Sequence, residues 1–313
     1  MRKVSEALRF LGALVLALLV LGFVVLRVTS CSPTRGPPPT AAPATAIAPP
    51  PAPVAAAPPT RADCATGPAD AAAANAASLS TLIWAPFRHR PETGWETYAP
   101  LIAREIGTEC PPGSAGFAAR FAAWQQAHGL GPDGVMSAAA FDRLSGLVEL
   151  RRPFVRLNAT GVCPAPPPEA ALAAATPAES YGGMTIRLRP AALAAYRRMV
   201  SAARTDVPGL AADPQLLTLF SGYRGPAQES ARCAGGGCGG PAKASCSAHR
   251  TGLAMDIDLG AAPGSRIDSS DDPNRLYMSR TPAYRWLIRN ADRFGFVNYP
   301  FEPWHWEWTG EQP

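Results

Sequence analysis

Apolar residues dominate the start of the chain and then almost disappear. Residues 10–26 form a 17-residue apolar run behind three basic residues, which is typical of a targeting segment or a membrane anchor. Residues 33–59 contain eleven prolines, mostly separated by alanine and threonine. Such a stretch has too few large apolar residues to bury a core. We therefore predict a signal peptide or membrane anchor at 1–31 and an extended, semi-rigid tether at 32–75.

Apolar residues return with helical spacing in residues 76–160. Phe117, Phe121 and Trp124 lie on one face of a helical projection. A run of turn formers at 131–134 follows, and then a serine suited to cap the next helix. The pattern predicts a small all-α module with short helices at 96–106, 116–127 and 137–147.

From residue 184 to the end, strand and helix patterns alternate without a regular repeat. Leu253, Met255 and Ile257 alternate with more polar positions, which indicates a strand. Further strands are expected at 184–188 and 216–220, and helices from residue 190 and at 281–294. Irregular mixing favours an α+β fold rather than a doubly wound sheet. A Pro- and Ala-rich linker at 161–183 separates this domain, 184–313, from the helical module.

The charge balance argues against a nucleic-acid-binding protein. The chain has 29 Lys and Arg against 24 Asp and Glu, a net charge of +5 that is spread along the sequence. Residues 28–31, VTSC, resemble the lipobox of bacterial lipoproteins, with Cys31 as the lipidated residue. The alternative is an uncleaved signal anchor with its positive flank in the cytoplasm. Both predict an exported protein tethered to the membrane, facing the periplasm or cell wall.

Cysteine usage fits an exported chain. Beyond Cys31 an even number remains, as expected for disulfides in an oxidising compartment: Cys64, Cys110, Cys163, Cys233, Cys238 and Cys246. Six cysteines allow 15 pairings, of which Cys64 with Cys110 is plausible because both flank the helical module. A metal finger built from the last three is less favoured, because their spacing is not that of a CxxC pair.

Two of the four histidines lie in the C-terminal domain, close to acidic residues. His249 precedes a predicted strand that carries Asp256 and Asp258, and His305 lies in the final aromatic stretch. Two histidines and one carboxylate form a set suited to catalytic zinc, with a fourth position left for water. Either aspartate can complete it. The chain has no HExxH helix, which excludes the helical zinc-protease arrangement.

The segment FAARFAAWQQAHGLGPDGVMSAAAFDRL, residues 117–144, resembles the small three-helix peptidoglycan-binding module. A helix ending in glutamine and glycine, an Asp-Gly turn and a second helix with an aromatic residue carry the likeness. The resemblance implies that residues 76–160 bind the cell wall. The alternative interpretation is a three-helix bundle of no particular function.

The C-terminal domain resembles the LAS group of zinc peptidases, in its D-alanyl-D-alanine carboxypeptidase branch related to the vancomycin-resistance enzymes. Three motifs in order carry the likeness over residues 184–313. SGYR occupies residues 221–224, SxHxxGxAxD occupies 247–256 and ExWH occupies 302–305.

The resemblance implies a catalytic domain with a small, mainly antiparallel sheet and flanking helices, and it implies a role for each matching residue. Zinc would be bound by His249, Asp256 and His305. Glu302 would act as general base and acid, and Arg224 would stabilise the oxyanion. Substrate-binding roles would fall to Ser247, Gln228 and Tyr223. Gln228 stands one residue nearer to the arginine than is common in the family, which puts its role in doubt.

Strand alternation raises a rival for the catalytic glutamate. In a strand over 304–308, Glu307 shares a face with His305, whereas the three tryptophans share the other face and are expected in the core. Glu302 is still preferred, because Pro303 should break the strand and let Glu302 enter from a loop. Asp258 is the rival to Asp256 and otherwise supports the site from outside.

These observations predict a tethered, exported zinc carboxypeptidase that removes a terminal D-amino acid from peptidoglycan stem peptides. An endopeptidase with the same zinc site is the nearest alternative. A wall-binding protein whose metal site is inert is the alternative from a different class, and the presence of Glu302 argues against it.

Overall fold

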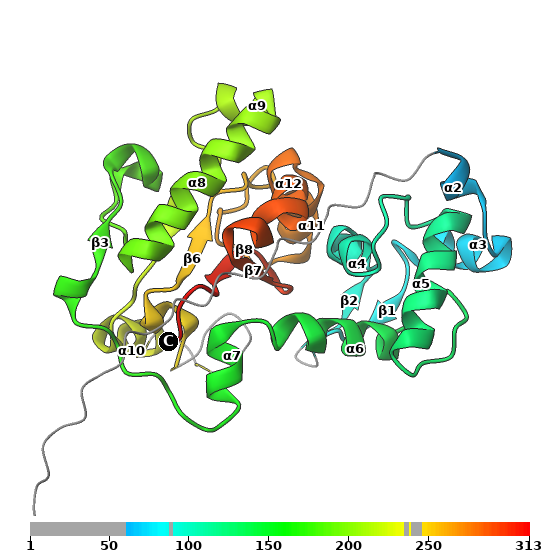
Figure 1. Ribbon diagram of the computed structural model, residues 1–313, viewed down its shortest axis with the longest axis horizontal. Coiled ribbons are helices and arrows are strands. Elements are labelled where there is room, and N and C mark those ends of the chain that lie inside the picture. Colours follow the sequence, from blue (N-terminus) through cyan, green and yellow to red (C-terminus); the bar gives the residue numbers. More distant parts are fainter. Residues whose placement is uncertain (1–60, 88–89, 235–237, 239–245) are drawn as a thin grey trace, which may run out of the picture. The chain divides into compact units, whose positions relative to one another are not determined.

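The computed structural model describes residues 61–87, 90–234, 238 and 246–313 (Figure 1). The predicted signal or anchor, Cys31 and most of the predicted tether lie outside these residues. Within the described part of the chain, no helix is both long and apolar enough to cross a membrane. Membrane attachment stays a prediction from the sequence.

Residues 61–158 form a helical region. Its helices are α2 (Arg61–Ala65), α3 (Ala69–Ser78), α4 (Ala99–Glu105), α5 (Ala115–Ala127), α6 (Ala138–Glu149) and α7 (Pro153–Asn158). Strands β1 (Ile83–Trp84) and β2 (Glu92–Thr93) pair in an antiparallel hairpin, and the 3-10 turn η1 (Glu96–Tyr98) leads into α4. The three predicted helices correspond to η1 with α4, to α5 and to α6. The predicted cap is confirmed, because the Ser137 hydroxyl accepts the backbone N–H of Ala140.

Part of the stretch predicted as tether belongs to this helical region. In α3 the side chain of Asn75 is fully buried. It donates to the carbonyl of Gly134 and accepts the N–H of Met136, both at 2.8 Å. Residues 69–75 are therefore helical and packed, and an extended tether over that span is wrong. Alanine favours helix strongly and makes up most of α3.

Residues 169–313 form a sheet region around four antiparallel strands in the order β5-β6-β8-β7 (Figure 1). They are β5 (Leu219–Ser221), β6 (Ala254–Ile257), β8 (Glu302–Trp308) and β7 (Phe296–Tyr299). The helices are α8 (Pro190–Asp206), α9 (Pro208–Ala212), α10 (Pro226–Ala234), α11 (Asp272–Arg280) and α12 (Pro282–Asn290). The short turns are η2 (Glu169–Ala171), η3 (Pro177–Glu179), η4 (Tyr181–Gly183), η5 (Ala248–Thr251) and η6 (Ala291–Phe294). The predicted α+β fold is confirmed.

Local signals explain where several of these elements begin and end. Helix α12 starts after Thr281, whose hydroxyl accepts the N–H of Tyr284, and η6 ends at Gly295 in a left-handed conformation with φ of 85°. The strand predicted at 184–188 is limited to β4 (Arg187–Leu188). It pairs with β3 (Ala173–Ala174) from the predicted linker. That linker therefore contributes a strand next to the sheet region.

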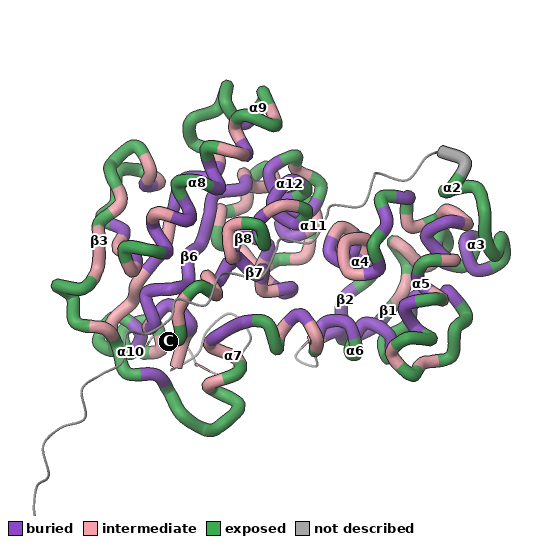
Figure 2. The backbone as a smooth tube through the Cα atoms, in the orientation of Figure 1, coloured by how far each residue is buried: buried purple, intermediate pink, exposed green. Residues whose placement is uncertain are grey.

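One hydrophobic core runs through both regions. A single cluster of buried residues includes Trp84 and Phe141 of the helical region together with Met255 and Trp306 of the sheet region. Figure 2 shows β6 as one of the buried segments. Phe87 packs against Phe301 with ring centroids 5.1 Å apart. The two regions thus share buried contacts, while the predicted domain boundaries and the wall-binding role of residues 76–160 stay predictions.

The cysteines within the described residues form three disulfides. The predicted pairing of Cys64 with Cys110 is confirmed. Cys163 pairs with Cys246, which precedes His249 by three residues. Cys233, in α10, pairs with Cys238. The last three cysteines therefore do not form a metal finger.

Candidate metal centre

Two neighbouring strands place an aspartate and a histidine opposite each other. In the antiparallel pair β6–β8, Asp256 lies across from His305, and Ala254 lies across from Glu307. Side chains directly opposite on one face of a sheet have Cβ atoms about 5 Å apart. This register therefore brings the Asp256 carboxylate to the His305 ring. Trp306 points to the other face and is buried in the core.

His249 reaches the same point from the turn η5. The turn ends at Gly252, whose φ of 70° is a conformation that glycine adopts without strain. Nδ1 of His249 donates to the carbonyl of Gly222 at 2.7 Å, since a carbonyl can only accept. The lone pair on Nε2 is then directed at Asp256 and His305. Gly222 is needed here, because a Cβ would lie 2.6 Å from the backbone oxygen of Arg187.

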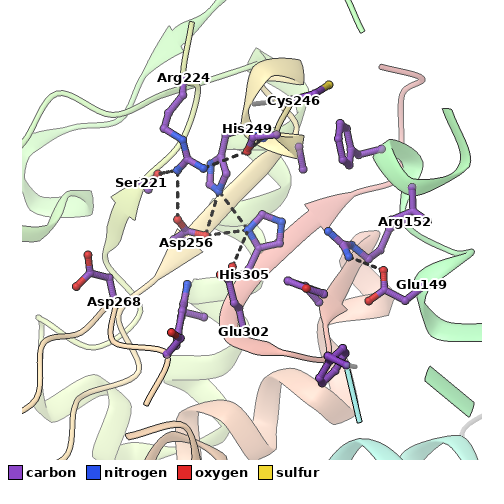
Figure 3. A pocket seen from close by; sticks show the side chains of 18 of the residues that line it. Glu149, Arg152, Ser221, Arg224, Cys246, His249, Asp256, Asp268, Glu302 and His305 are labelled. Atoms are coloured by element: carbon purple, nitrogen blue, oxygen red, sulfur yellow. Dashed lines mark hydrogen bonds and ion pairs between the residues drawn. The ribbon is translucent and has the colours of Figure 1, made fainter. Parts of the chain in front are cut away.

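Three donor atoms converge in this arrangement (Figure 3). Nε2 of His249 lies 3.1 Å from Nδ1 of His305 and 3.2 Å from Oδ1 of Asp256. Nδ1 of His305 lies 2.9 Å from the same carboxylate oxygen. Zinc bonds of about 2.1 Å in a tetrahedral site set neighbouring donors about 3.4 Å apart. The three buried side chains therefore fit a zinc ion after shifts of a few tenths of an ångström.

The charges in the cluster favour a cation at its centre. Burial, reinforced by Arg224, lowers the pKa of His249 to about 4, which keeps this ring neutral. Burial would also lower the pKa of His305, but the nearby carboxylates of Asp256 and Glu307 raise it to about 9. Although burial opposes ionisation of Asp256, the two histidines hold its pKa well below the ordinary value. A divalent ion bound by the same atoms would displace the proton of His305.

Glu302 joins the cluster through irregular strand pairing. Strand β8 runs through Pro303, so the expectation that this proline ends the strand is wrong. Instead, the register between β7 and β8 shifts at Asn298 and Tyr299. The Asn298 amide donates to the carbonyls of residues 302, 303 and 305 at 3.3, 3.2 and 2.9 Å. The shift puts Oε2 of Glu302 at 4.0 Å from Nδ1 of His305, although strict alternation would place it on the opposite face.

The environment of Glu302 suits proton transfer. Burial is the largest influence and raises the pKa of its carboxyl to about 7, against the opposing effect of His305. A carboxyl group with a pKa near neutral can accept and release a proton at physiological pH. Glu302 therefore lies beside the donor cluster with a carboxyl suited to proton transfer, and the role of general base and acid that the resemblance implies stays a prediction.

Arg224 lies on the other side of the cluster and is held by two hydroxyl groups. Its Nη1 donates to Ser221 at 2.7 Å, and its Nη2 donates to Ser247 at 3.1 Å. Nη1 also lies 3.7 Å from Oδ2 of Asp256. Burial lowers the pKa of Arg224, but a guanidinium keeps its charge at neutral pH. Arg224 therefore presents a fixed positive charge at the edge of the donor cluster.

The three predicted substrate-binding residues take different positions. The hydroxyl of Ser247 lines the cavity described below, but it already accepts from Arg224 and from the N–H of His249. Gln228 is exposed, and its side-chain oxygen accepts the N–H of Gly225 at the start of α10. Neither Gln228 nor Tyr223 is among the described residues that line the cavity. Their substrate-binding roles stay predictions.

The two acidic rivals take positions outside the donor cluster. Asp258 lies beyond the end of β6, and its carboxylate accepts the N–H of Gly260 at 2.8 Å. Glu307 lies on the far side of the His305 ring, with Oε1 3.5 Å from Nε2. The structure thus brings Asp256 and Glu302 to the face of His305 that points into the cluster.

A cavity of about 780 Å³ opens over the donor cluster. Its lining comes from the sheet region, with Arg224, His249, Asp256, Glu302 and His305, and from the helical region, with Phe87, Asp142, Ser145, Glu149 and Arg152. We call this cavity the cleft. The sequence did not predict that α6 and the start of α7 would form one of its walls.

The sequence analysis did not predict two charged residues that lie near the cluster. The buried Glu229 of α10 accepts the N–H of Ser247 at 3.1 Å and pairs with Arg250. Arg152 bonds Glu307 at 2.7 Å from the other region of the chain. Burial opposes the ionisation of Glu307, yet Arg152 holds its pKa at about 2. Sequence spacing cannot reveal either contact, whereas period-two alternation did place Glu307 beside His305.

Comparison with known proteins points to one family for the C-terminal part. Residues 241–311 match the model of the VanY family, described as D-alanyl-D-alanine carboxypeptidase. This confirms the predicted family resemblance for a segment that contains His249, Asp256, Glu302 and His305. A crystal structure of a mutant vancomycin-resistance D,D-pentapeptidase VanY from a VanB-type resistance cassette, in complex with Zn(II), is 23% identical. That match covers 46% of this chain and 83% of the other, with a TM-score of 0.27. No curated protein matches the chain.

Proposed function

We propose that this chain is an exported zinc D-alanyl-D-alanine carboxypeptidase that hydrolyses peptidoglycan stem peptides. The observation that carries the proposal is the convergence of His249, Asp256 and His305, with the carboxyl of Glu302 at 4.0 Å from one donor atom. The family match over residues 241–311 supports the same activity. Tethering to the membrane rests on the apolar run and on Cys31 in the sequence.

The three converging side chains would hold the zinc ion. When bound, zinc lowers the pKa of water towards about 7 and polarises the scissile carbonyl. Glu302 takes a proton from the attacking water, whose oxygen forms a bond to the carbonyl carbon. As the carbon–nitrogen bond breaks, Glu302 passes the same proton to the leaving amine. The products are a shortened peptide with a carboxylate and a free D-amino acid.

Arg224 supplies the remaining charge complementarity. Its guanidinium faces the cleft and is held by Ser221 and Ser247, so it loses little freedom when an anion binds. Either the oxyanion that develops on the carbonyl or the terminal carboxylate of the substrate is a suitable partner. Ser247 acts in this arrangement by orienting Arg224.

The proposal is tested on a defined pentapeptide that ends in D-Ala-D-Ala. The full chain is expected to release D-alanine, to stop when a chelator is added and to recover with zinc. The variant Glu302→Gln should retain zinc and lose at least about 100-fold in kcat, the usual contribution of a general base. Its matched control is Asp142→Asn, which alters another acidic side chain of the cleft. If Glu302→Gln turned over normally, the mechanism would be wrong.

An endopeptidase is the second candidate. The cleft extends from the zinc ligands to α6 of the helical region, which leaves room for peptide on both sides of the scissile bond. Mass spectrometry of products from cross-linked and linear stem peptides separates the two activities. Release of D-alanine alone supports the carboxypeptidase, whereas cleavage within a cross-link supports the endopeptidase. Zinc binding without cleavage of either substrate would favour an inert wall-binding protein.

A further inference from the structure

We infer that Arg152, in the helical region, is a positioning residue for the metal site: it holds Glu307 against the outer nitrogen of His305. The inference rests on the proposed zinc site and deepens it. It means that the sheet region carries the three zinc ligands, while the orientation of one of them depends on a side chain from the other region of the chain.

The argument starts at the two ring nitrogens of His305. Nδ1 faces the donor cluster, and Nε2 lies 3.5 Å from Oε1 of Glu307. Within the described residues Nε2 has no hydrogen-bond partner, so this close approach of the Glu307 carboxylate is the polar contact that it makes. A histidine that binds a metal generally donates its other N–H to a carboxylate or carbonyl, which fixes the ring. His249 has the carbonyl of Gly222 for this purpose, and Glu307 stands in the equivalent place for His305.

Glu307 is in turn held by the helical region. Its Oε1 accepts from Nε of Arg152 at 2.7 Å and lies 2.7 Å from Nη2. Its Oε2 accepts the backbone N–H of Phe154 at 3.2 Å. Across the sheet on β6, the residue opposite Glu307 is Ala254, which has no polar side chain. Both hydrogen bonds that orient this carboxylate therefore come from the start of α7.

Arg152 is itself fixed and out of solvent. Its Nη1 donates to Glu149 at 2.6 Å, and its guanidinium lies over the ring of Tyr299, 4.2 Å from the centroid. Only 7% of its side chain is exposed, against 2% for Glu307. Arg152 precedes α7 at the N-cap position but does not cap the helix with its side chain. The Arg152 side chain instead contacts Glu307 on β8.

A buried ion pair can also be purely structural, and the chain contains a matched example. Arg275 in α11 is buried, bonds Glu92 at 3.0 Å and so joins the same two regions. Its Nε donates to the carbonyl of Phe301 at 2.8 Å, and within the described residues none of its hydrogen bonds is with a metal ligand. Loss of Arg275 should lower stability and leave the zinc site intact. Loss of Arg152 should affect both.

The test measures zinc binding directly, in the full chain, by competition with a chromogenic chelator. Arg152→Met is expected to raise the zinc dissociation constant about tenfold, the lower end of the effect of losing the direct partner of a ligand, because Glu307 remains but loses its orientation. Arg152→Lys, which keeps the charge but not the paired geometry, should fall between wild type and Arg152→Met. The visible spectrum of the cobalt(II)-substituted protein should shift in Arg152→Met, since it reports ligand geometry.

The control is Arg275→Met, which should keep the wild-type zinc dissociation constant and cobalt spectrum. Arg152→Met leaves the Glu307 carboxylate buried without its partner. If that variant does not fold, the same measurements are made on the double variant Arg152→Met/Glu307→Gln, which removes both charges. The inference is overturned if these Arg152 variants keep wild-type zinc binding and cobalt spectrum, or if Arg275→Met weakens zinc binding equally. A wild-type chain that binds zinc but cleaves no stem peptide would refute the proposed function alone. Absence of zinc binding in the wild-type chain would overturn both.

Discussion

Two buried arginines join the helical region to the sheet region by binding a carboxylate. They differ in the further side chain that this carboxylate contacts. Arg152 reaches from the helical region to Glu307 on β8, which stands behind His305. Arg275 reaches from α11 to Glu92 of β2 and also contacts the hydroxyl of Tyr98. Both are almost completely buried. Only the first pair lies one contact away from the proposed zinc.

The difference shows that burial and charge alone do not identify a functional ion pair. Breaking either pair leaves a carboxylate without its partner in the interior, which destabilises the folded chain in both cases. The two pairs differ in the group that each carboxylate contacts besides its arginine. Glu307 contacts a histidine ring, and Glu92 contacts a tyrosine hydroxyl. The two pairs can therefore be compared by stability, which both should affect, and by zinc binding, which only one should affect.

The largest effect is expected on folding stability when the pair farther from zinc is broken. Arg275→Met should lower the free energy of unfolding by about 3–5 kcal/mol, because Glu92 is left buried and unpaired. Urea unfolding of the full chain measures this. The double variant Arg275→Met/Glu92→Gln should recover much of the loss, since it removes both charges. A loss below about 1 kcal/mol would mean that the pair behaves like one exposed to solvent.

A smaller effect is expected in the stabilisation that zinc provides. A ligand at 100 times its dissociation constant stabilises the folded state by about 2.7 kcal/mol. A tenfold weaker site, as expected for Arg152→Met, should reduce the gain at equal free zinc by about 1.4 kcal/mol. Unfolding of metal-free and zinc-loaded protein at one free zinc concentration measures this gain. The gain should be unchanged in Arg275→Met, and an equal reduction in both variants would remove the distinction between the two pairs.

The smallest effect is expected for an ion pair at the surface. Arg197 of α8 bonds Glu179 at 2.6 Å and lowers the pKa of that carboxyl to about 2, with a 46% exposed arginine side chain. Because the folded pKa lies below the ordinary 4.5, the pair contributes stability above pH 4.5. That contribution disappears as the pH falls towards 2. Glu179→Gln should cost less than about 1 kcal/mol at pH 7, and its difference from wild type should shrink in unfolding measurements at pH 3. A difference that grows at low pH would reverse the assigned sign.

Local patterns predicted α5, α6, α8 and α12 well but not α10 or α11, and the choice of zinc ligands stays a prediction. Helix α8 starts at Pro190, and Ser137 and Thr281 cap α6 and α12, because capping depends on residues that are near in sequence. His249 and Asp256 are brought together by a turn and a strand with a glycine between them. The strand predicted at 216–220 begins only at Leu219, three residues later, since its pairing with β6 determines where it begins.

Local sequence patterns did not predict the orientation of the Glu302 side chain. Period-two alternation favoured Glu307 beside His305, and Pro303 was expected to end the strand. In the structure both glutamates lie near the ring, one on each side, because β7 and β8 pair irregularly and the Asn298 amide satisfies the carbonyls that this shift leaves free. A register shift depends on the partner strand, so the sequence of β8 alone cannot predict it.

The sequence by itself indicated a zinc site of two histidines and one of two aspartates, the α+β pattern of the C-terminal part and one disulfide, because each follows from residue chemistry or short-range spacing. Only the tertiary structure decided that Glu302 and Glu307 lie on opposite sides of His305. It also decided that Arg152, 155 residues away from Glu307 along the chain, supports one of them. Contacts at that separation arise when two regions bury a common core, and the packing of that core determines which charged side chains meet inside it.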